Sequence, residues 1–342
     1  MLSYKNTNRG ISMAKRNQKI FLIINTGYFG DVILTSKLTR DIKKNHPNCH
    51  LVYIADTPYQ KAAKGLPGVD EVICYDRKKC HNIFSFIKFL INFPYKNKIN
   101  YTLIPHGRKT NRTLLAHLLG SKKIFELRKG INKKSYRKLR LKNALNLRFA
   151  YEAANMLFPI TGEMTDSKDI EFNVCKKDEE KINTMLNELN LKENLIAINP
   201  NAGDDWKRWD VEEVVKLAKE LTKDGKKVIL TGVLKDGCQY IKALDKELGS
   251  ENYINLVDKT SISELGALYK RCEAVISVDT GSMHMSCAVG TPTIALFFKK
   301  NFNYWGPLDT KKNRCLFDIE SISAETVMDE LRQISYSSNG FE

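Results

Sequence analysis

Residues 274–297 read AVISVDTGSMHMSCAVGTPTIALF. The first five and the last five residues of this stretch are apolar and rich in β-branched side chains, which predicts two buried parallel strands. The small residues between them favour a helix that packs closely on the sheet. Asp279, Thr280 and Gly281 therefore stand where the first strand ends and the helix begins, with His284 one turn further on. In open α/β sheets, ligands bind in the crevice at that position.

Two interpretations of this helix start remain open. Its unpaired backbone N–H groups and the positive end of its dipole suit a phosphate, which His284 is placed to contact as well. Alternatively, Asp279 and Thr280 only cap the helix, and His284 is a packed residue on a helix face.

The length and composition predict a two-domain protein without a membrane span. The chain has 342 residues, 42% of them hydrophobic, which is enough for two cores. No run reaches the roughly 18 apolar residues of a membrane-spanning helix. Residues 1–18 are polar and basic, and we expect a disordered tail there instead of a secretory signal. The eight cysteines form no C-x-x-C pair, which predicts a reducing compartment with neither disulfides nor a zinc site.

The positive charge of the chain is concentrated. The formal net charge is +16, and residues 121–150 hold eleven Lys or Arg residues against one acid, Glu126. Such a patch predicts an anionic partner: a nucleic acid, an anionic membrane surface or a phosphorylated substrate. The alternative is a basic face that is merely solvated.

Strand and helix patterns alternate along both halves of the chain, which predicts doubly wound parallel sheets. In the first half, we expect strands at 19–24, 50–55, 69–75, 101–104 and 122–125, and helices at 32–44, 60–64, 82–92, 110–119 and 143–157. In the second half, we expect strands at 195–198, 227–231, 253–256, 274–278 and 293–297. Its expected helices are 211–223, 239–248, 263–270, the segment after Gly281, and 323–334 with Ser323 as N-cap. A polar stretch at 161–168 divides the chain into domains of residues 19–165 and 166–342.

The first strand leads into a glycine turn that carries Asp31. A strand followed by such a turn suggests a dinucleotide-binding fold, with Asp56 as the ribose ligand of NAD. The G-x-G-x-x-G pattern is not met, however, because only Gly27 and Gly30 are present and its first position is Asn25. We therefore rank NAD low. Asp31 is either a first-turn acid that favours the helix dipole or a general base at the mouth of the cleft.

A second loop, NPNAGDDWKRW at 199–209, also leaves a strand and enters a helix. Small residues such as Gly203 let the backbone approach a ligand, and Lys207 and Arg208 offer cations for phosphate. We expect its two tryptophans to pack. The chain contains no D-x-D motif, which argues against a metal that holds a nucleotide diphosphate.

Four pieces in this order and spacing resemble the heptosyltransferase family of bacterial glycosyltransferases. They are GDV at 30–32 with the following LT at 34–35, the 199–209 loop, VDTG at 278–281 with His284, and GTP at 290–292 with WGP at 305–307. The resemblance spans about residues 19–331. It implies a GT-B fold, which consists of two facing Rossmann-like domains with a cleft between them. It also implies inverting, metal-independent transfer of a heptose from an ADP-activated donor to the inner core of lipopolysaccharide, without a cofactor.

Residue roles follow from the resemblance and from the charge pattern. The resemblance places the base on Asp31. It places donor contacts on Lys207, Asp279, Thr280 and Gly281, and we add His284 and Gly203 to this set. We expect Gly30 and the basic residues Arg137, Lys138 and Arg140 to face the acceptor. This chain has Ala202-Gly203 where the family often carries hydroxyl residues, and it departs from the commoner Leu within 282–285.

The implied partners are a nucleotide-sugar donor and an anionic glycolipid at the inner face of the cytoplasmic membrane, where the protein would be peripherally bound. An acceptor that bears phosphates and carboxylates explains the basic segment without a nucleic acid. Two alternatives remain open. One is a sugar-nucleotide epimerase of the same fold, and the other is a nucleic-acid-binding protein, which only the charge suggests.

Overall fold

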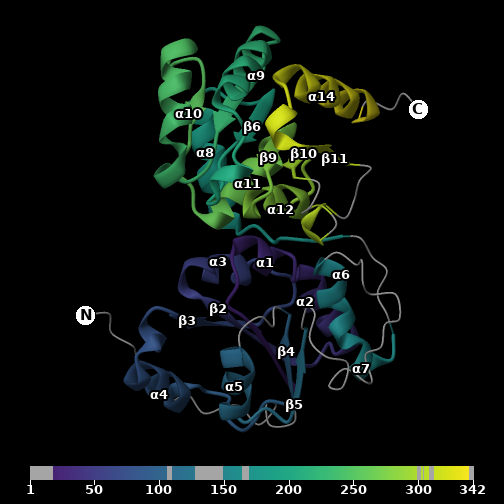
Figure 1. The fold of residues 1–342 in the computed structure, drawn as a ribbon. Coiled ribbons are helices and arrows are strands. Elements are labelled where there is room, and N and C mark those ends of the chain that lie inside the picture. Colours follow the sequence, from purple (N-terminus) through teal and green to yellow (C-terminus); the bar gives the residue numbers. More distant parts are fainter. Residues whose placement is uncertain are drawn as a thin grey trace.

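The computed structural model describes residues 18–105, 110–127, 149–163, 169–298, 302, 304–307 and 312–338. Two α/β domains stand one above the other, with the amino-terminal domain below in the view of Figure 1. Each domain contains one parallel sheet with helices on both faces. The architecture predicted from the alternating pattern, two doubly wound domains in succession, is therefore confirmed.

The amino-terminal sheet has the strand order β3-β2-β1-β4-β5, and every pairing is parallel. Its strands are β1 (Ile20–Asn25), β2 (His50–Asp56), β3 (Glu71–Tyr75), β4 (Tyr101–Ile104) and β5 (Lys123–Glu126). The helices around it are α1 (Phe29–Ile33), α2 (Ser36–Asn45), α3 (Gln60–Lys64), α4 (Ile83–Asn92), α5 (Thr110–Leu118), α6 (Phe149–Ala154) and α7 (Phe158–Thr161). Side chains alternate across the sheet: Phe21 and Ile23 pack under α2 and α6, whereas Leu22 and Ile24 pack under α4 and α5.

The carboxy-terminal sheet has the strand order β11-β10-β9-β6-β7-β8, again parallel throughout. Its strands are β6 (Leu195–Asn199), β7 (Lys227–Leu230), β8 (Ile254–Asn255), β9 (Ala274–Val278), β10 (Thr293–Phe297) and β11 (Asn313–Phe317). The helices are α8 (Lys176–Glu188), α9 (Val211–Lys223), α10 (Leu234–Glu247), α11 (Ile262–Arg271), α12 (Gly281–Ala288) and α14 (Ala324–Ser338). Counted from β6, this is the 3-2-1-4-5-6 order of dinucleotide-binding domains, in which ligands bind where the order reverses.

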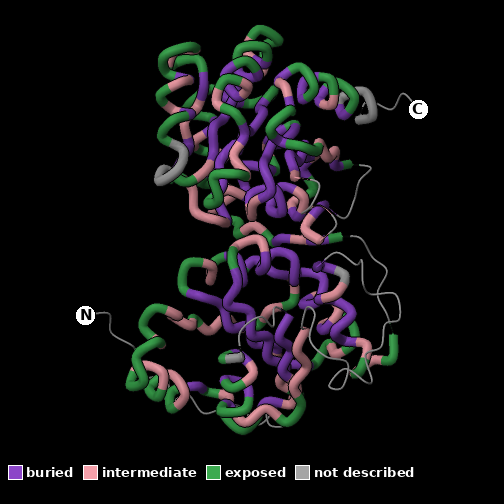
Figure 2. The backbone as a smooth tube through the Cα atoms, viewed as in Figure 1, coloured by how far each residue is buried: buried purple, intermediate pink, exposed green. Residues whose placement is uncertain are grey.

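One core joins the two domains, as the buried segments at their junction indicate (Figure 2). Residues 169–175 run between the domains in extended form. In this linker, the Asn173 amide donates to the Gly65 carbonyl at 2.7 Å, and the Phe172 amide donates to the Ala288 carbonyl at 3.0 Å. A Cβ on Gly65 would lie 2.2 Å from the Phe172 ring, so only glycine fits there. The linker is thus hydrogen-bonded to both domains. The boundary at 165/166 stays a prediction because residues 164–168 lie outside the described chain.

Several predicted elements were wrong in detail. The single helix expected at 32–44 is two helices, because the chain turns at Leu34 and Thr35. There the Thr35 hydroxyl bonds to the Val32 carbonyl at 2.7 Å and to the Tyr53 hydroxyl at 2.9 Å. The helix expected at 143–157 is described only from Phe149, where it divides into α6, a short 3₁₀ turn and α7.

Two elements, α8 and β11, were not predicted. In α8 only Ile182 and Leu186 are buried, so its apolar stripe is too narrow to stand out from the charged residues around it. β11 pairs only with β10 and lies at the edge of the sheet, where its one fully buried residue is Asn313. The helix predicted at 239–248 starts five residues earlier, at Leu234.

The predicted cap Ser323 is present, because its hydroxyl accepts from the Thr326 amide at the start of α14, and Ser261 caps α11. Of the helices in the described residues, none has the length and apolar composition that crossing a membrane requires.

Candidate functional site

The first turns of α1 and α12 meet where the two domains face each other (Figure 1). The contact is made through glycines. A Cβ on Gly30 would lie 2.8 Å from His284 Cδ2, and a Cβ on Gly281 would lie 2.3 Å from Phe29 Cδ1. Neither position has room for a side chain. The two sequence motifs that were predicted to line a cleft are therefore brought into direct contact.

Asp31 lies in the first turn of α1 with only 8% of its surface exposed. Its Oδ2 accepts a hydrogen bond from the Tyr28 amide at 2.9 Å, which closes the start of the helix. Gly27 packs against this carboxylate, because a Cβ there would lie 2.4 Å from Oδ2. Within the described residues, Oδ1 accepts no hydrogen bond. One oxygen of Asp31 thus has the structural role that the alternative interpretation proposed, and the other has no such role in the described part of the chain.

Sequence reasoning missed two arginines at this edge of the amino-terminal sheet. Arg112 is buried, its Nε donates to Thr26 Oγ1 at 2.9 Å, and it interacts electrostatically with Asp31. Burial lowers the Arg112 pKa, and the field of Asp31 opposes that shift. Arg77 pairs with Asp56 at 2.7 Å, so Asp56 holds an arginine and does not stand alone as a ribose ligand would. Neither arginine belongs to a motif, and only the fold brings them to the glycine turn.

Lys207 and Asp279 form an ion pair on the opposite side of the site. Lys207 Nζ lies 2.8 Å from Asp279 Oδ2 and 3.4 Å from the Asp279 carbonyl oxygen. β6 and β9 are neighbours in the sheet, so the loop after β6 and the end of β9 lie side by side. Lys207 Nζ also lies 5.2 Å from the centre of the Trp206 ring. The side chain of Lys207 remains partly exposed, whereas that of Asp279 is buried.

His284 lies between the two halves of the site. It packs against Gly30, and both Asp279 and Lys207 act on its titration. The His284 pKa is lowered to about 4, mainly by burial; the charge of Asp279 opposes this shift, and the charge of Lys207 adds to it. The imidazole is therefore neutral at physiological pH. The Thr280 side chain does not cap α12, because its hydroxyl donates to the Val278 carbonyl at 3.3 Å.

Two buried asparagines lie at the carboxyl end of β6, Asn199 as its last residue and Asn201 two residues later, and sequence reasoning missed them as well. Asn201 Nδ2 donates to the Val233 carbonyl at 2.8 Å. The side-chain oxygens of Asn199 and Asn201 have no hydrogen-bond partner in the described part of the chain. Gly232 lies beside both with φ of +140°. Buried amide oxygens are seldom left unpaired, and the pattern N-x-N at the end of a buried strand was the available signal.

The remaining predicted residues lie in different environments. Gly203 is exposed, with open space around it. The two tryptophans differ: Trp209 is buried and donates to the Ile322 carbonyl at 2.9 Å, whereas Trp206 is half exposed. Arg137, Lys138 and Arg140 lie outside the described residues. In the 304–307 loop, Trp305 packs on Phe149 of α6, so this loop of the second domain reaches the first.

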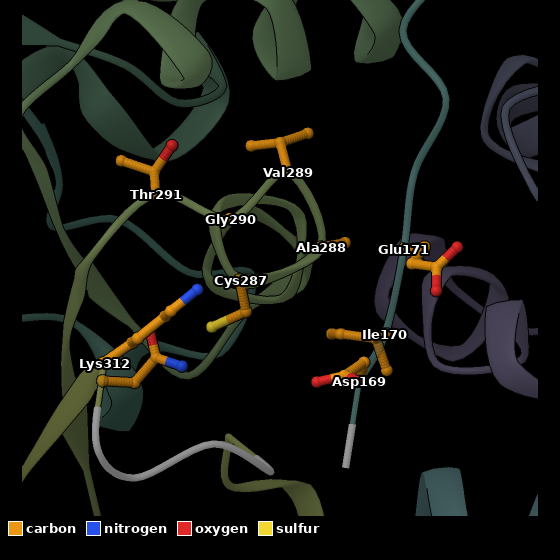
Figure 3. A pocket seen from close by; sticks show the side chains of 10 residues that line it. Asp169, Ile170, Glu171, Cys287, Ala288, Val289, Gly290, Thr291 and Lys312 are labelled. Carbon is orange, nitrogen blue, oxygen red and sulfur yellow. The ribbon is translucent and has the colours of Figure 1, made fainter. Parts of the chain in front are cut away.

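A pocket of about 340 Å³ lies elsewhere, between the linker, the end of α12 and the start of β11 (Figure 3). Its lining includes Asp169, Glu171, Cys287 and Lys312. Because it adjoins residues just before β10 and the first residue of β11, it lies at the amino ends of these strands, opposite the edge that carries Asp279. It contains none of the predicted site residues.

Comparisons with known proteins show the family and agree with the fold. Residues 133–333 match the family model described as glycosyltransferase family 9 (heptosyltransferase). Lipopolysaccharide heptosyltransferase 3 of Escherichia coli (strain K12) is 28% identical over 289 residues, which are 82% of this chain and 83% of that protein. The solved ADP-heptose lps heptosyltransferase II of E. coli superposes with a TM-score of 0.77 at 19% identity, covering 94% of this chain and 100% of that one. E. coli heptosyltransferase WaaC with ADP superposes with a TM-score of 0.73 at 14% identity, covering 92% and 99%.

Proposed function

The chain belongs to glycosyltransferase family 9, the heptosyltransferases, and on that premise we propose that it moves a heptose from an ADP-activated donor to an anionic inner-core acceptor of lipopolysaccharide. It is a glycosyltransferase with the GT-B fold. The E. coli relative solved with ADP supports the adenine nucleotide, and the name of the 28% identical relative supports a lipopolysaccharide acceptor. Inversion at the anomeric carbon and independence from metal are part of the proposal.

One observation carries this proposal. A carboxylate of the first domain, Asp31, and a cation of the second, Lys207, lie on opposite sides of a single contact between α1 and α12, with His284 packed between them. Glycosyl transfer needs a proton acceptor beside the attacking hydroxyl and positive charge beside the leaving group. The arrangement supplies each from a different domain.

In the proposed reaction, Asp31 Oδ1 takes the proton of an acceptor hydroxyl. The hydroxyl oxygen forms a bond to the anomeric carbon from the face opposite the diphosphate, and the configuration inverts. The bond from that carbon to the diphosphate oxygen breaks, and its electron pair stays on the diphosphate. Lys207 Nζ and the backbone N–H groups at the start of α12 meet the charge that develops there.

The ion pair changes the proposed role of Asp279. A buried carboxylate repels a diphosphate, so a direct contact between the two would be unfavourable. We propose instead that Asp279 orients Lys207 and that Lys207 contacts the diphosphate. The charge of Lys207 would then take over part of the work that a divalent metal performs elsewhere.

The two asparagines complete the proposed donor subsite. Asn199 Oδ1 and Asn201 Oδ1 are acceptors only, so they suit the hydroxyl or amino hydrogens of a nucleoside. They lie at the carboxyl end of β6, the strand that precedes Lys207 in the chain and that pairs with β9. A nucleoside at this edge would satisfy both oxygens while its diphosphate reaches Lys207.

On the acceptor side, we propose that Arg112 and Arg77 contribute positive charge beside Asp31, together with the basic segment around Arg137, Lys138 and Arg140. This charge suits a phosphorylated glycolipid. We also propose that the protein acts at the inner face of the cytoplasmic membrane, where it binds peripherally, and that it has no nucleic-acid partner.

A donor panel tests this function. Purified enzyme treated with EDTA is incubated with nucleotide sugars and heptose-deficient lipopolysaccharide, and products are identified by mass spectrometry and by NMR of the anomeric proton. We expect transfer from ADP-heptose with inversion and with release of ADP. Loss of activity in EDTA that Mg²⁺ restores would contradict metal independence. Release of free nucleotide without any acceptor would favour the epimerase alternative.

A further inference from the structure

Two helices that pack on the same face of the amino-terminal sheet, α4 and α5, expose apolar side chains. We define the α4–α5 face by six residues: Ile83, Phe84, Ile87 and Ile91 of α4, and Leu114 and Leu118 of α5. Each is between 40% and 78% exposed, and together they are six of the eleven large apolar side chains that the described residues expose. This concentration is unusual, since exposed apolar residues are normally scattered singly.

The face has a simple geometric origin. Phe86, Phe89 and Leu90 of α4 pack against the core under the sheet, in the same cluster as Leu115 and Ala116 of α5. The two helices therefore cover one face of the sheet, and their outer sides point away from it. Helix α4 is apolar on its inner and its outer side.

The outer side of α4 is a continuous stripe. Ile83, Ile87 and Ile91 follow one another at intervals of four residues, which places them on one side of the helix. The polar residues of α4, Ser85, Lys88 and Asn92, share one narrow side, and a helix that is apolar over most of its circumference is normally buried. Here the outer stripe is covered by nothing in the described part of the molecule, and exposed helix and loop mark this region in the lower part of Figure 2.

Positive charge surrounds the apolar surface. From Arg77 to Phe125, the sequence contains eleven Lys or Arg residues and no Asp or Glu. Four exposed lysines lie before, within and after α4, namely Lys78, Lys88, Lys96 and Lys98. An apolar helix side with exposed lysines on and beside its helix is the pattern of a surface that inserts at an anionic lipid interface.

We propose that the α4–α5 face binds the anionic leaflet of a bilayer, with its apolar side chains among the acyl chains and its lysines at the headgroups. A second copy of this chain is a poorer occupant, because it would bring two rings of lysines together. The proposal deepens the proposed function and rests on its lipid-linked acceptor.

β3 ends at Tyr75 and α4 begins at Ile83, so the first turn of α4 lies near the edge that carries Asp56 and Arg77. Docking by this face would bring the acceptor half of the site to the membrane.

Vesicle sedimentation with the full chain tests the proposal. Vesicles of phosphatidylethanolamine with phosphatidylglycerol are compared with vesicles of phosphatidylcholine alone. We expect the wild-type protein to bind the anionic vesicles. The affinity of Phe84→Ser/Ile91→Ser for these vesicles should be at least about tenfold lower, because two apolar side chains that the bilayer would bury are removed. The matched control is Leu189→Ser, which removes an exposed apolar side chain of the second domain and should bind like wild type.

The charge part of the proposal has its own variants. Lys78→Glu/Lys88→Glu should weaken binding to anionic vesicles severalfold, and added salt should reduce wild-type binding in the same direction. Lys246→Glu, which alters an exposed lysine of α10, should leave binding unchanged. Equal binding of Phe84→Ser/Ile91→Ser and wild type would overturn the proposal. So would a dimer in sedimentation velocity that this variant abolishes without any effect on vesicle binding.

Failure of this proposal is distinguishable from failure of the proposed function. Transfer to a deacylated, lipid-free acceptor should be equal in wild type and Phe84→Ser/Ile91→Ser, and their melting temperatures should agree because the replaced side chains are exposed. If the wild-type protein binds vesicles but transfers no heptose, the proposed function is refuted and the membrane-binding proposal stands. If it transfers heptose but does not bind vesicles, only the membrane-binding proposal is refuted.

Discussion

The two halves of the site hold their charged groups in different ways. Asp31 is fixed by backbone, since its Oδ2 accepts from the Tyr28 amide and its own position is set by the first turn of α1. Lys207 is fixed by another side chain, Asp279, at 2.8 Å. A backbone-held carboxylate stays in place whatever its neighbours are, whereas a side-chain pair reorganises when one partner is removed or when an anion competes. Mutation of Asp31 should therefore change the rate of the chemical step alone, whereas mutation of Lys207 should change both ligand affinity and protein stability.

The largest expected effect is that of Asp31→Asn. The amide keeps the size of the side chain but takes no proton, and removal of a general base costs about 10²–10⁴-fold in rate. Turnover, measured with saturating donor and acceptor, should fall by that order, while donor affinity by calorimetry stays near wild type. If Asp31 only supports the helix start, turnover will be nearly normal and the free energy of unfolding will fall by about 0.3–1 kcal/mol.

The next effect is that of Lys207→Ala. Loss of a charge-assisted contact to the diphosphate should weaken ADP binding by about 1.5–3 kcal/mol. The same change leaves the Asp279 carboxylate buried without its cation, so stability should also fall. The double variant Lys207→Ala/Asp279→Asn separates the two effects: it should regain stability in denaturant titrations but not affinity in calorimetry. Wild-type affinity for ADP in Lys207→Ala would exclude the proposed diphosphate contact.

A smaller effect concerns pH, at the point where the halves meet. The His284 pKa is about 4 in the folded protein against 6.5 for an unperturbed histidine. Between these values the unfolded chain binds the extra proton, so the free energy of unfolding falls as pH decreases from about 6.5 towards about 4. At pH 5 the loss should be about 2 kcal/mol relative to pH 7. His284→Gln removes the titrating group, and urea titrations should show a correspondingly shallower pH dependence than wild type. Identical pH dependence in both proteins would mean that His284 titrates normally.

The smallest effect is expected from charge reversal of Arg137, Lys138 and Arg140. We expect the acceptor KM to rise severalfold and donor affinity to stay constant, because exposed charges act mainly through screened long-range attraction. Initial rates over a range of acceptor and salt concentrations measure this. An acceptor KM that responds neither to the variants nor to salt would assign the basic segment to another partner.

Much of the site was predictable because it depends on local sequence. A residue directly after an apolar strand must lie at the carboxyl end of that strand, which holds for Asp279, Thr280 and Gly281 after β9. Asp31 lies six residues after β1, and the short glycine turn keeps it at the same end of its strand. Asn199 and Asn201 also lie at the end of a strand but were not predicted as site residues. The loop was interpreted as a phosphate site because of its lysine and arginine, and its asparagines were not considered.

The sequence by itself determined the two parallel sheets, the ends of most strands and the family, because strand–helix periodicity and short glycine turns are local properties. Tertiary structure alone decided which of these ends meet. It paired Lys207 with Asp279, 72 residues away in the chain, buried His284 against Gly30, and brought Arg112 to the glycine turn 86 residues before it. It also left the outer side of α4 uncovered in the described part of the chain. The physical reason is that ion pairing, desolvation and exposure depend on neighbours that are distant in the sequence, and no periodic pattern encodes them.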